Sequence, residues 1–233
     1  YSRGKAHIPA FLDDYAFTVQ AMIDLSSVDP DSTWLNTAQK LTDEMIEQFW
    51  DEQTGSLYLS SRHHADLILR PRSKRDGYVP SGLSVTAMNL LRLNRLTGKA
   101  RYKRIADTIL RNSSNKMRER PDEHGYLLTA LLFKLSPPNE VVLMVNDKQE
   151  DRLSWEPIRF LVGHYYFPNT VILTTYPQSS NKDKESSYPL LKGRSLHEQK
   201  PTIFVCKNFV CSYPINDIER LRNTLNEISG QKK

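Results

Sequence analysis

The sequence has little cysteine, with only Cys206 and Cys211 among 233 residues. Two cysteines are too few for a framework of disulfides. Their spacing in "CKNFVC" is too wide for a Cys-x-x-Cys redox motif, and no second ligand pair is present for a zinc site. Because residues five apart in one strand point to opposite faces of a sheet, bridging is also disfavoured. We therefore predict two buried or half-buried free thiols.

Long apolar runs are also lacking. No segment approaches the run of about 18 apolar residues that a membrane-spanning helix needs, and no leader precedes a small-residue cleavage site. With 39% hydrophobic residues, the composition is typical of a soluble protein, and we expect no membrane partner. The chain begins at Tyr1 rather than Met, so we expect that the N-terminal part of a longer protein is missing. Any targeting signal would be lost with it, which leaves the compartment open.

The chain lacks an even distribution of charge, although its net charge is +5. Residues 1–61 contain ten acidic and three basic residues, whereas residues 92–120 contain ten basic and two acidic residues. Nucleic-acid binding would require aromatic stacking platforms among these cations, and only Tyr102 lies there. We interpret the basic stretch as a solvated helix face and expect no nucleic-acid partner.

Several catalytic and ligand-binding motifs are absent from the sequence. No glycine-rich loop follows a predicted strand, which disfavours a nucleotide cofactor. No serine lies in a Gly-x-Ser-x-Gly elbow, so a serine hydrolase triad has no support. His63 and His64 have no histidine or carboxylate at metal-ligand spacing. We therefore predict neither a cofactor nor a metal site.

Helical periodicity dominates the first part of the chain. Apolar spacing predicts helices at about 12–26, 82–97, 100–112 and 125–135, and a second helix that is capped by Ser32 or Thr33 and has apolar residues from Leu35 to Phe49. The second and fourth helices have one apolar face, whereas the third and fifth are apolar nearly all round. A helix of the latter kind must be enclosed, and one-faced helices can enclose it. We therefore predict the first, third and fifth helices inside and the other two outside.

The helices also repeat in pairs. Four apolar residues of the first helix match four of the third at an offset of 66, namely Val19, Ala21, Met22 and Leu25 with Val85, Ala87, Met88 and Leu91. Between the copies we predict a β-hairpin, made from a strand after the Thr54-Gly55 turn and another around 65–69, followed by an ordered loop. Two layers of helical hairpins indicate an α/α toroid. A closed ring of six hairpins needs twelve helices, so five helices predict a partial ring.

The pattern changes at about residue 137. Strands are predicted at 140–145, 170–175 and 201–206, with helices at about 155–167 and 217–228. This order is typical of a small α/β module. The predicted domains are therefore a mainly helical partial (α/α)6 toroid at 1–136 and a C-terminal α/β module at 137–233.

Several strings occur in an order that resembles one known family. They are "GKAHIPAFLDDYAF", "FWDEQTGSLYL", "DGYVPSGLSVTAMNLLRLNRLTG", "FPNTVIL" and "PTIFVCKNFVC". The resemblance is to the spermatogenesis-associated protein 20 family, also described as thioredoxin-domain-containing proteins, and covers essentially all residues. It implies an N-terminal thioredoxin-like domain followed by an (α/α)6 toroid of the six-hairpin glycosidase type, of which this chain looks like the C-terminal part. Leu83 in "PSGLS" departs from the Asn that is usual in the family.

The candidate site follows from where inner helices begin. In an α/α toroid these starts gather at one end of the cavity, so Asp13, Asp14 and Asp76 are candidate acid and base residues. Candidate substrate-binding residues nearby are Tyr15, Arg70, Tyr78, Ser81 and Ser84. Each has a structural explanation as well, because Asp and Ser cap helices and Asp76-Gly77 is a turn signal.

Two functions remain open at this point. The first is a toroid that binds or processes a carbohydrate, in the manner of a glycoside hydrolase or an epimerase. The second is a non-catalytic scaffold for a protein partner, with any redox chemistry in the missing thioredoxin-like domain. The residues alone leave open whether the chain is an enzyme, because fold analogy is a weak basis for function.

Overall fold

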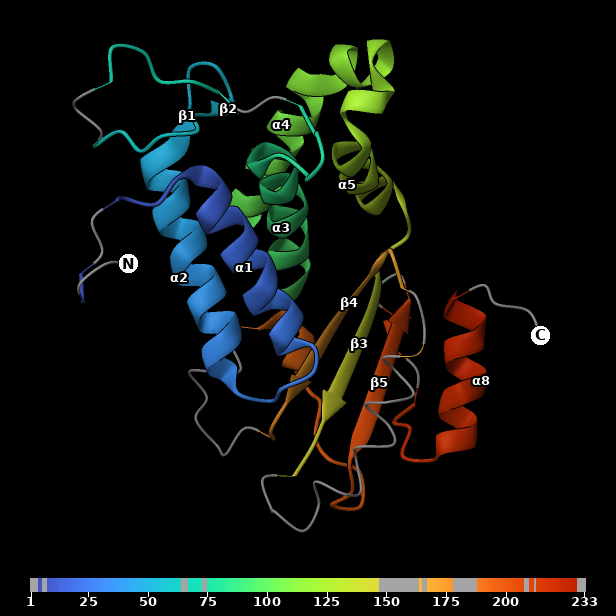
Figure 1. The fold of residues 1–233 in the computed structure, drawn as a ribbon. Coiled ribbons are helices and arrows are strands. Elements are labelled where there is room, and N and C mark those ends of the chain that lie inside the picture. Colours follow the sequence, from blue (N-terminus) through green and yellow to red (C-terminus); the bar gives the residue numbers. More distant parts are fainter. Residues whose placement is uncertain are drawn as a thin grey trace. The chain divides into compact units, whose positions relative to one another are not determined.

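A computed structural model describes most of the chain (Figure 1). The described residues are 4–5, 8–63, 67–72, 75–146, 164, 167–177, 188–207, 210–211 and 213–229. They form two compact units. The helical unit comprises Tyr1–Ile23, Leu35–Asn94 and Lys99–Lys134, and the sheet unit comprises Asp24–Trp34, Arg95–Gly98 and Leu135–Lys233.

Five α-helices and one short 3-10 helix come before residue 136. They are α1 (Leu12–Ser26), α2 (Ser32–Phe49), α3 (Gly82–Thr97), α4 (Ala100–Glu119), η1 (Pro121–Glu123) and α5 (Gly125–Leu135). The predicted bounds of α1, α3 and α5 are confirmed. Helix α4 continues beyond its predicted end at 112. The cap of α2 is Asp31 rather than Ser32 or Thr33, because Asp31 Oδ1 accepts a hydrogen bond from the Thr33 amide at 2.8 Å.

Helix α3 is the centre of the helical core. Every residue from 81 to 90 is buried, which confirms the prediction that this helix is enclosed. Contacts with α1 include a hydrogen bond of 2.8 Å from the Asn89 side chain to the Ala16 carbonyl. Contacts between α1 and α2 include one of 3.1 Å from Gln48 Nε2 to the Tyr15 hydroxyl.

Helices α1 and α5 differ from the prediction. Phe17 on α1 is 38% exposed and Leu132 on α5 is 55% exposed, so neither helix is buried all round. Within the described residues, no element covers these faces. The expectation that the first and fifth helices are enclosed is therefore wrong for this chain. The chain is mainly helical, with six α-helices among the described residues, and the toroid stays a prediction.

A short hairpin follows α2. Strand β1 (Trp50–Asp51) pairs antiparallel with β2 (Ser56–Leu57). The turn between them depends on Gly55, which has a φ of +59° that side chains rarely adopt. The predicted second strand at 65–69 is wrong where it is described, because residues 67–69 form no strand. Strand β2 pairs with β1, which directly follows α2, instead. Residues 64–66 lie outside the described residues.

Among the described residues of the sheet unit, four strands form a sheet in the order β4-β3-β5-β6. They are β3 (Asn139–Met144), β4 (Thr170–Thr175), β5 (Thr202–Lys207) and β6 (Val210–Cys211), accompanied by η3 (Pro189–Leu191) and α8 (Ile218–Ser229). β3 pairs parallel with β4 and antiparallel with β5. The predicted strands and last helix are confirmed within one residue, and the helix predicted at 155–167 falls almost entirely outside the described residues.

The core of the sheet unit lies between the strands and α8, which runs alongside β5 (Figure 1). Its buried members are Val141, Leu143, Val145, Ile203, Val205, Ile215, Leu221 and Leu225. Every second residue of β3 and β5 contributes to this list, as expected for one face of a sheet. The α8 residues Leu221 and Leu225 are four apart and therefore share a helix face.

Cys206 and Cys211 form a disulfide, so the prediction of two free thiols is wrong. The prediction treated both residues as positions on one strand. In the structure the chain reverses between them, and they become directly opposed partners on the antiparallel strands β5 and β6. Directly opposed residues share a face, which allows the sulfur atoms to meet.

Candidate functional site

Two of the predicted acidic residues meet at the start of α3. The Ser81 amide donates a hydrogen bond of 2.9 Å to Asp76 Oδ1, and the Gly82 amide donates one of 2.9 Å to Asp13 Oδ1. Since the two amides are adjacent in the chain, the two carboxylates lie within about 10 Å of each other. The structure thus brings Asp13 and Asp76 together although 63 residues separate them in sequence.

Gly82 makes this approach possible. A Cβ atom at this position would overlap Asp13 Oδ1 and lie 3.0 Å from Leu12 Cγ. Glycine therefore allows the start of α1 to pack directly on the start of α3. The glycine at a predicted helix start was the sequence signal for this close contact.

Asp14 has a different environment. Its Oδ2 accepts a hydrogen bond of 2.8 Å from the Phe11 amide, three residues earlier, and the side chain is exposed. A carboxylate in the first turn that binds the amide preceding the helix is one half of a capping box. This contact explains Asp14 by the start of its own helix.

Asp76 joins the starts of two helices. Besides the Ser81 amide at α3, its Oδ2 accepts hydrogen bonds from the Tyr126 amide at 2.8 Å and the Leu127 amide at 3.4 Å, both in the first turn of α5. Burial alone would raise the pKa of Asp76, but these amides and the Ser84 hydroxyl lower it further than burial raises it. The Asp76 carboxylate is therefore more acidic than an ordinary Asp and stays ionised at neutral pH.

Asp13 is shifted in the opposite direction. Burial raises its pKa, the hydrogen bond from Gly82 lowers it, and the neighbouring charge of Asp14 raises it again, so that the net pKa lies above the ordinary value. Its Oδ2 accepts no hydrogen bond from the described part of the chain. Two nearby carboxyl groups with pKa values displaced in opposite directions resemble an acid and base pair.

The predicted serines are part of the helix start. Ser81 and Ser84 are buried, their Oγ atoms lie 3.0 Å apart, and the Ser84 amide donates a hydrogen bond of 3.2 Å to Ser81 Oγ. This pattern is that of an N-cap residue. The serines hold the backbone that in turn holds Asp13 and Asp76.

The remaining predicted binding residues do not share one environment. The Tyr15 hydroxyl accepts its hydrogen bond from Gln48, and its ring packs edge-on against Phe49 with centroids 5.5 Å apart. The Arg70 guanidinium donates to the carbonyls of Ser60 and Gln48, the shorter bond being 2.6 Å. Tyr78 is fully exposed. Tyr15 and Arg70 therefore have internal partners, whereas the Tyr78 ring faces solvent.

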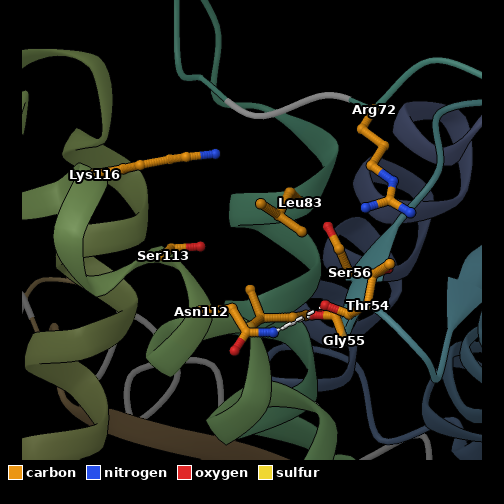
Figure 2. A pocket seen from close by; sticks show the side chains of 9 residues that line it. Thr54, Gly55, Ser56, Arg72, Leu83, Asn112, Ser113 and Lys116 are labelled. Atoms are coloured by element: carbon orange, nitrogen blue, oxygen red, sulfur yellow. Dashed lines mark hydrogen bonds between the residues drawn. The ribbon is translucent and has the colours of Figure 1, made fainter.

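A pocket of about 160 Å³, which the sequence analysis missed, borders the first turn of α3 (Figure 2). It is lined by Thr54, Gly55, Ser56, Arg72, Leu83, Ile109, Asn112, Ser113 and Lys116. The α4 members are spaced three, one and three residues apart, so they share one helix face. This spacing was the available signal in the sequence. The basic stretch that contains it was interpreted only as a solvated helix face.

The pocket wall is held in place by Asn112. Its Nδ2 donates hydrogen bonds of 3.1 Å to the carbonyls of both Thr54 and Gly55, which ties the β1–β2 turn to α4 (Figure 2). A Cβ atom at Gly55 would lie 2.6 Å from Asn112 Nδ2. Glycine at the turn therefore serves both the backbone conformation and this contact.

Two cations extend into the pocket from different segments, Lys116 from α4 and Arg72 from the loop before α3 (Figure 2). Arg72 Nη2 is 2.8 Å from Asp51 Oδ2 and also donates to the Tyr58 hydroxyl at 3.0 Å. Among the described residues, the Lys116 side chain has no ion pair. The described residues that line the pocket include no carboxylate. Its hydroxyl, amide and cationic groups suit a small ligand rich in oxygen atoms.

Within the described ranges, no group of three or more His, Cys, Asp or Glu side chains could hold a metal ion. No helix in the same part of the chain is long and apolar enough to cross a bilayer.

Comparison with known proteins gives consistent relatives. No family model matches the chain. It is 33% identical to human spermatogenesis-associated protein 20 over 217 residues, which are 92% of this chain and 27% of the relative. The rat protein of the same name is 32% identical over 93% of this chain and 27% of its own length. An uncharacterized protein of Caenorhabditis elegans is 27% identical over 97% of this chain and 30% of its own length. The chain therefore spans about a quarter of the length of the curated relatives it matches.

Proposed function

The chain belongs to the spermatogenesis-associated protein 20 family, and from this premise we propose that its helical unit binds a carbohydrate and acts on it at the start of α3. The name of the relatives specifies no substrate. The observation that carries the proposal is the pair of carboxyl groups, Asp13 and Asp76, on adjacent amides with pKa values displaced in opposite directions.

The pKa values of the pair are displaced in the two opposite directions that glycoside chemistry uses. In an inverting reaction, one carboxyl group donates a proton to the leaving oxygen while the other carboxylate accepts a proton from the attacking water, over a separation of about 6.5–9.5 Å. Asp13, whose pKa is raised and whose Oδ2 accepts no hydrogen bond from the described residues, is the proton donor in this proposal. Asp76 is the ionised base. The amide bonds to Asp76 reduce its basicity, so we expect slow turnover and a more readily measured binding step.

In this proposal the sugar binds in the pocket beside the acid pair, and the described lining of the pocket includes neither Asp13 nor Asp76. Leu83, which lines it, directly follows Gly82, whose amide binds Asp13. A volume of about 160 Å³ corresponds to about five water molecules, well below the 300–1,000 Å³ of a typical drug-sized site. The pocket therefore suits one sugar unit, and Lys116 favours a sugar that carries an acidic group.

The test is a panel of neutral and acidic sugars and oligosaccharides, offered to the full-length protein that contains this chain. Binding is measured by calorimetry and products by chromatography. We expect Asp13→Asn to abolish product formation. We expect Lys116→Ala to weaken the binding of acidic sugars about tenfold, because one charged hydrogen bond is lost. Asp31→Asn is the matched control, because Asp31 also caps a helix but lies outside the proposed site.

The proposal is wrong if Asp13→Asn and Asp76→Asn both turn over sugars at the wild-type rate. It is also wrong if no member of the panel binds the wild-type protein. Thermal unfolding of each variant separates a lost site from a lost fold.

A second function, a scaffold for a protein partner, is favoured by the loop between β2 and α3. Large apolar side chains of this loop are strongly exposed, namely Ile68, Leu69, Tyr78 and Val79. Exposed apolar patches are typical of protein interaction sites, and these four side chains of one loop are the candidates for such a patch. In this alternative, any redox chemistry would belong to the thioredoxin-like domain that the family resemblance implies.

The scaffold is tested by affinity capture with the full-length protein and with an Ile68→Ser/Tyr78→Ser variant. Loss of one specific partner from the variant, with unchanged thermal unfolding, supports the scaffold. Retention of every partner contradicts it. The sugar panel, run on the same variant, keeps the two proposals distinguishable.

A further inference from the structure

The disulfide of the sheet unit has one protected and one accessible end. Cys206 on β5 is 0% exposed, whereas its partner Cys211 on β6 is exposed. A thiolate from solution can therefore reach Cys211, while the surrounding protein shields Cys206. Attack at a defined sulfur of a disulfide fixes which cysteine leaves. In this geometry the leaving sulfur is Cys206.

A guanidinium group lies beside both sulfur atoms. Arg194 Nη2 is 2.9 Å from Cys206 Sγ and 2.9 Å from Cys211 Sγ. The side chain is fixed by a hydrogen bond to the Leu190 carbonyl and lies 5.7 Å from the centroid of the Phe204 ring. Disulfide sulfur is a weak acceptor, whereas a thiolate beside a cation is strongly stabilised and has a lowered pKa. Arg194 therefore interacts more strongly with the reduced form than with the oxidised form.

The charges around Arg194 also favour the reduced form of the cysteine pair. Glu140 on β3 is the cross-strand partner of Cys206 and is buried, and its charge interacts with both Arg194 and Arg95. Burial lowers the pKa of Arg95 to about 10 and also lowers that of Arg194, while Glu140 raises both, so each guanidinium stays charged at neutral pH. Among the described residues, the charged groups that act on Glu140 are the two guanidiniums of Arg194 and Arg95, and a Cys206 thiolate would add a second negative charge beside Arg194.

We propose that Cys206–Cys211 is a redox-active disulfide that undergoes thiol–disulfide exchange with low-molecular-weight thiols or dithiols. The thiolate of the reductant attacks Cys211 Sγ, the Sγ–Sγ bond breaks, and its electron pair leaves with Cys206 as a thiolate beside Arg194. A second reductant thiolate then attacks the reductant sulfur of the mixed disulfide and releases the Cys211 thiolate. The protein gains two electrons, and the reductant becomes a disulfide.

The experiment equilibrates the full-length protein in glutathione buffers of graded redox ratio, traps free thiols with an alkylating reagent and maps Cys206 and Cys211 by mass spectrometry. We expect both forms of the pair to be populated within the accessible ratios, and glutathione to be found on Cys211. A pair that stays oxidised until the protein unfolds, or a glutathione adduct on Cys206, overturns the proposal. These readouts use the wild-type protein.

A variant tests the positioning role of Arg194. In Arg194→Gln, we expect the thiol–disulfide equilibrium to shift about tenfold toward the disulfide, because the loss of one charged hydrogen bond to the thiolate has about this effect. We also expect the alkylation of Cys206 to require a higher pH. Arg194→Lys should restore part of both effects. Arg222→Gln, an exposed arginine on α8, is the control and should match wild type. Unchanged equilibrium and pH profile in a folded Arg194→Gln protein overturn the proposal.

Discussion

In the helical unit the carboxylate of Asp76 accepts hydrogen bonds from three backbone amides, whereas in the sheet unit the carboxylate of Glu140 is buried and its Oε1 has no hydrogen-bond partner among the described residues. The pKa of Asp76 is lowered and that of Glu140 is raised. The first amides of a helix have no partner within the helix, but the amides of a central strand are bonded to neighbouring strands. The first amides of a helix can therefore stabilise a carboxylate by hydrogen bonds. A carboxylate in the interior of a sheet lacks such amides and depends on the charges of cations instead.

The largest expected effect is that of Asp76→Ala. It leaves amides at the starts of both α3 and α5 without their acceptor, and we expect a loss of about 2–4 kcal/mol in the free energy of unfolding. Chemical denaturation followed by circular dichroism measures this loss. A loss below about 1 kcal/mol would show that water replaces the carboxylate and would remove the contrast with Glu140.

The pH dependence of Asp76 has a defined sign. Its folded pKa lies below the unfolded value of 3.8, so its contribution to stability is complete above pH 3.8 and is lost as pH falls through the folded pKa. Asp76→Asn cannot ionise and should therefore lose less stability between pH 4 and pH 2 than the wild type does. An identical acid profile would contradict the lowered pKa.

The next largest effect is that of Gly82→Ala. Its Cβ atom would meet Asp13 and Leu12, and we expect about 1–3 kcal/mol of destabilisation from overpacking. The clash involves the Asp13 side chain, so the same substitution in an Asp13→Ala background should cost less. A double-mutant cycle measures this coupling. Additive losses would show that the start of α1 moves away instead.

Glu140→Gln examines the sheet side of the comparison. The folded pKa of Glu140 lies above its unfolded value of 4.5, so the folded state binds more protons than the unfolded state between these values. The wild-type free energy of unfolding therefore falls as pH rises through this window, by at most about 1.4 kcal/mol per pH unit from this group. In Glu140→Gln this fall should become smaller, as pH-dependent denaturation would reveal, and the part that remains is the one that Asp13 contributes through its own raised pKa. A fall of the same size as in the wild type would mean that Glu140 does not bind the proton.

The sequence predicted best what is determined locally. The ends of α1, α3 and α5 follow from apolar spacing within each segment, and the enclosed position of α3 follows from its apolar residues all round. Prediction from the sequence failed for features that depend on a segment distant along the chain. The exposure of Leu132 depends on what covers α5, and the Cys206–Cys211 bond depends on a chain reversal between the two residues.

The candidate site shows the same division. The sequence placed Asp13 and Asp76 near the starts of inner helices, because acids and turn residues mark such starts. It could not reveal that Asp76 reaches the first turn of α5, 50 residues away. The pocket beside Leu83 was missed because it is assembled from four segments that are separate in sequence.

The smallest expected effect is that of Asp14→Ala. Asp14 is exposed and accepts one amide hydrogen bond, so water can partly replace it, and we expect a loss of about 0.5–1 kcal/mol in the free energy of unfolding. Denaturant titration beside Asp76→Ala under the same conditions gives the ratio of the two losses. Because both residues bind helix-start amides and differ in burial and in the number of donors, a ratio near one would mean that neither difference matters. A ratio of three or more would support the view that the junction of α3 and α5 makes Asp76 the principal carboxylate of the helical unit.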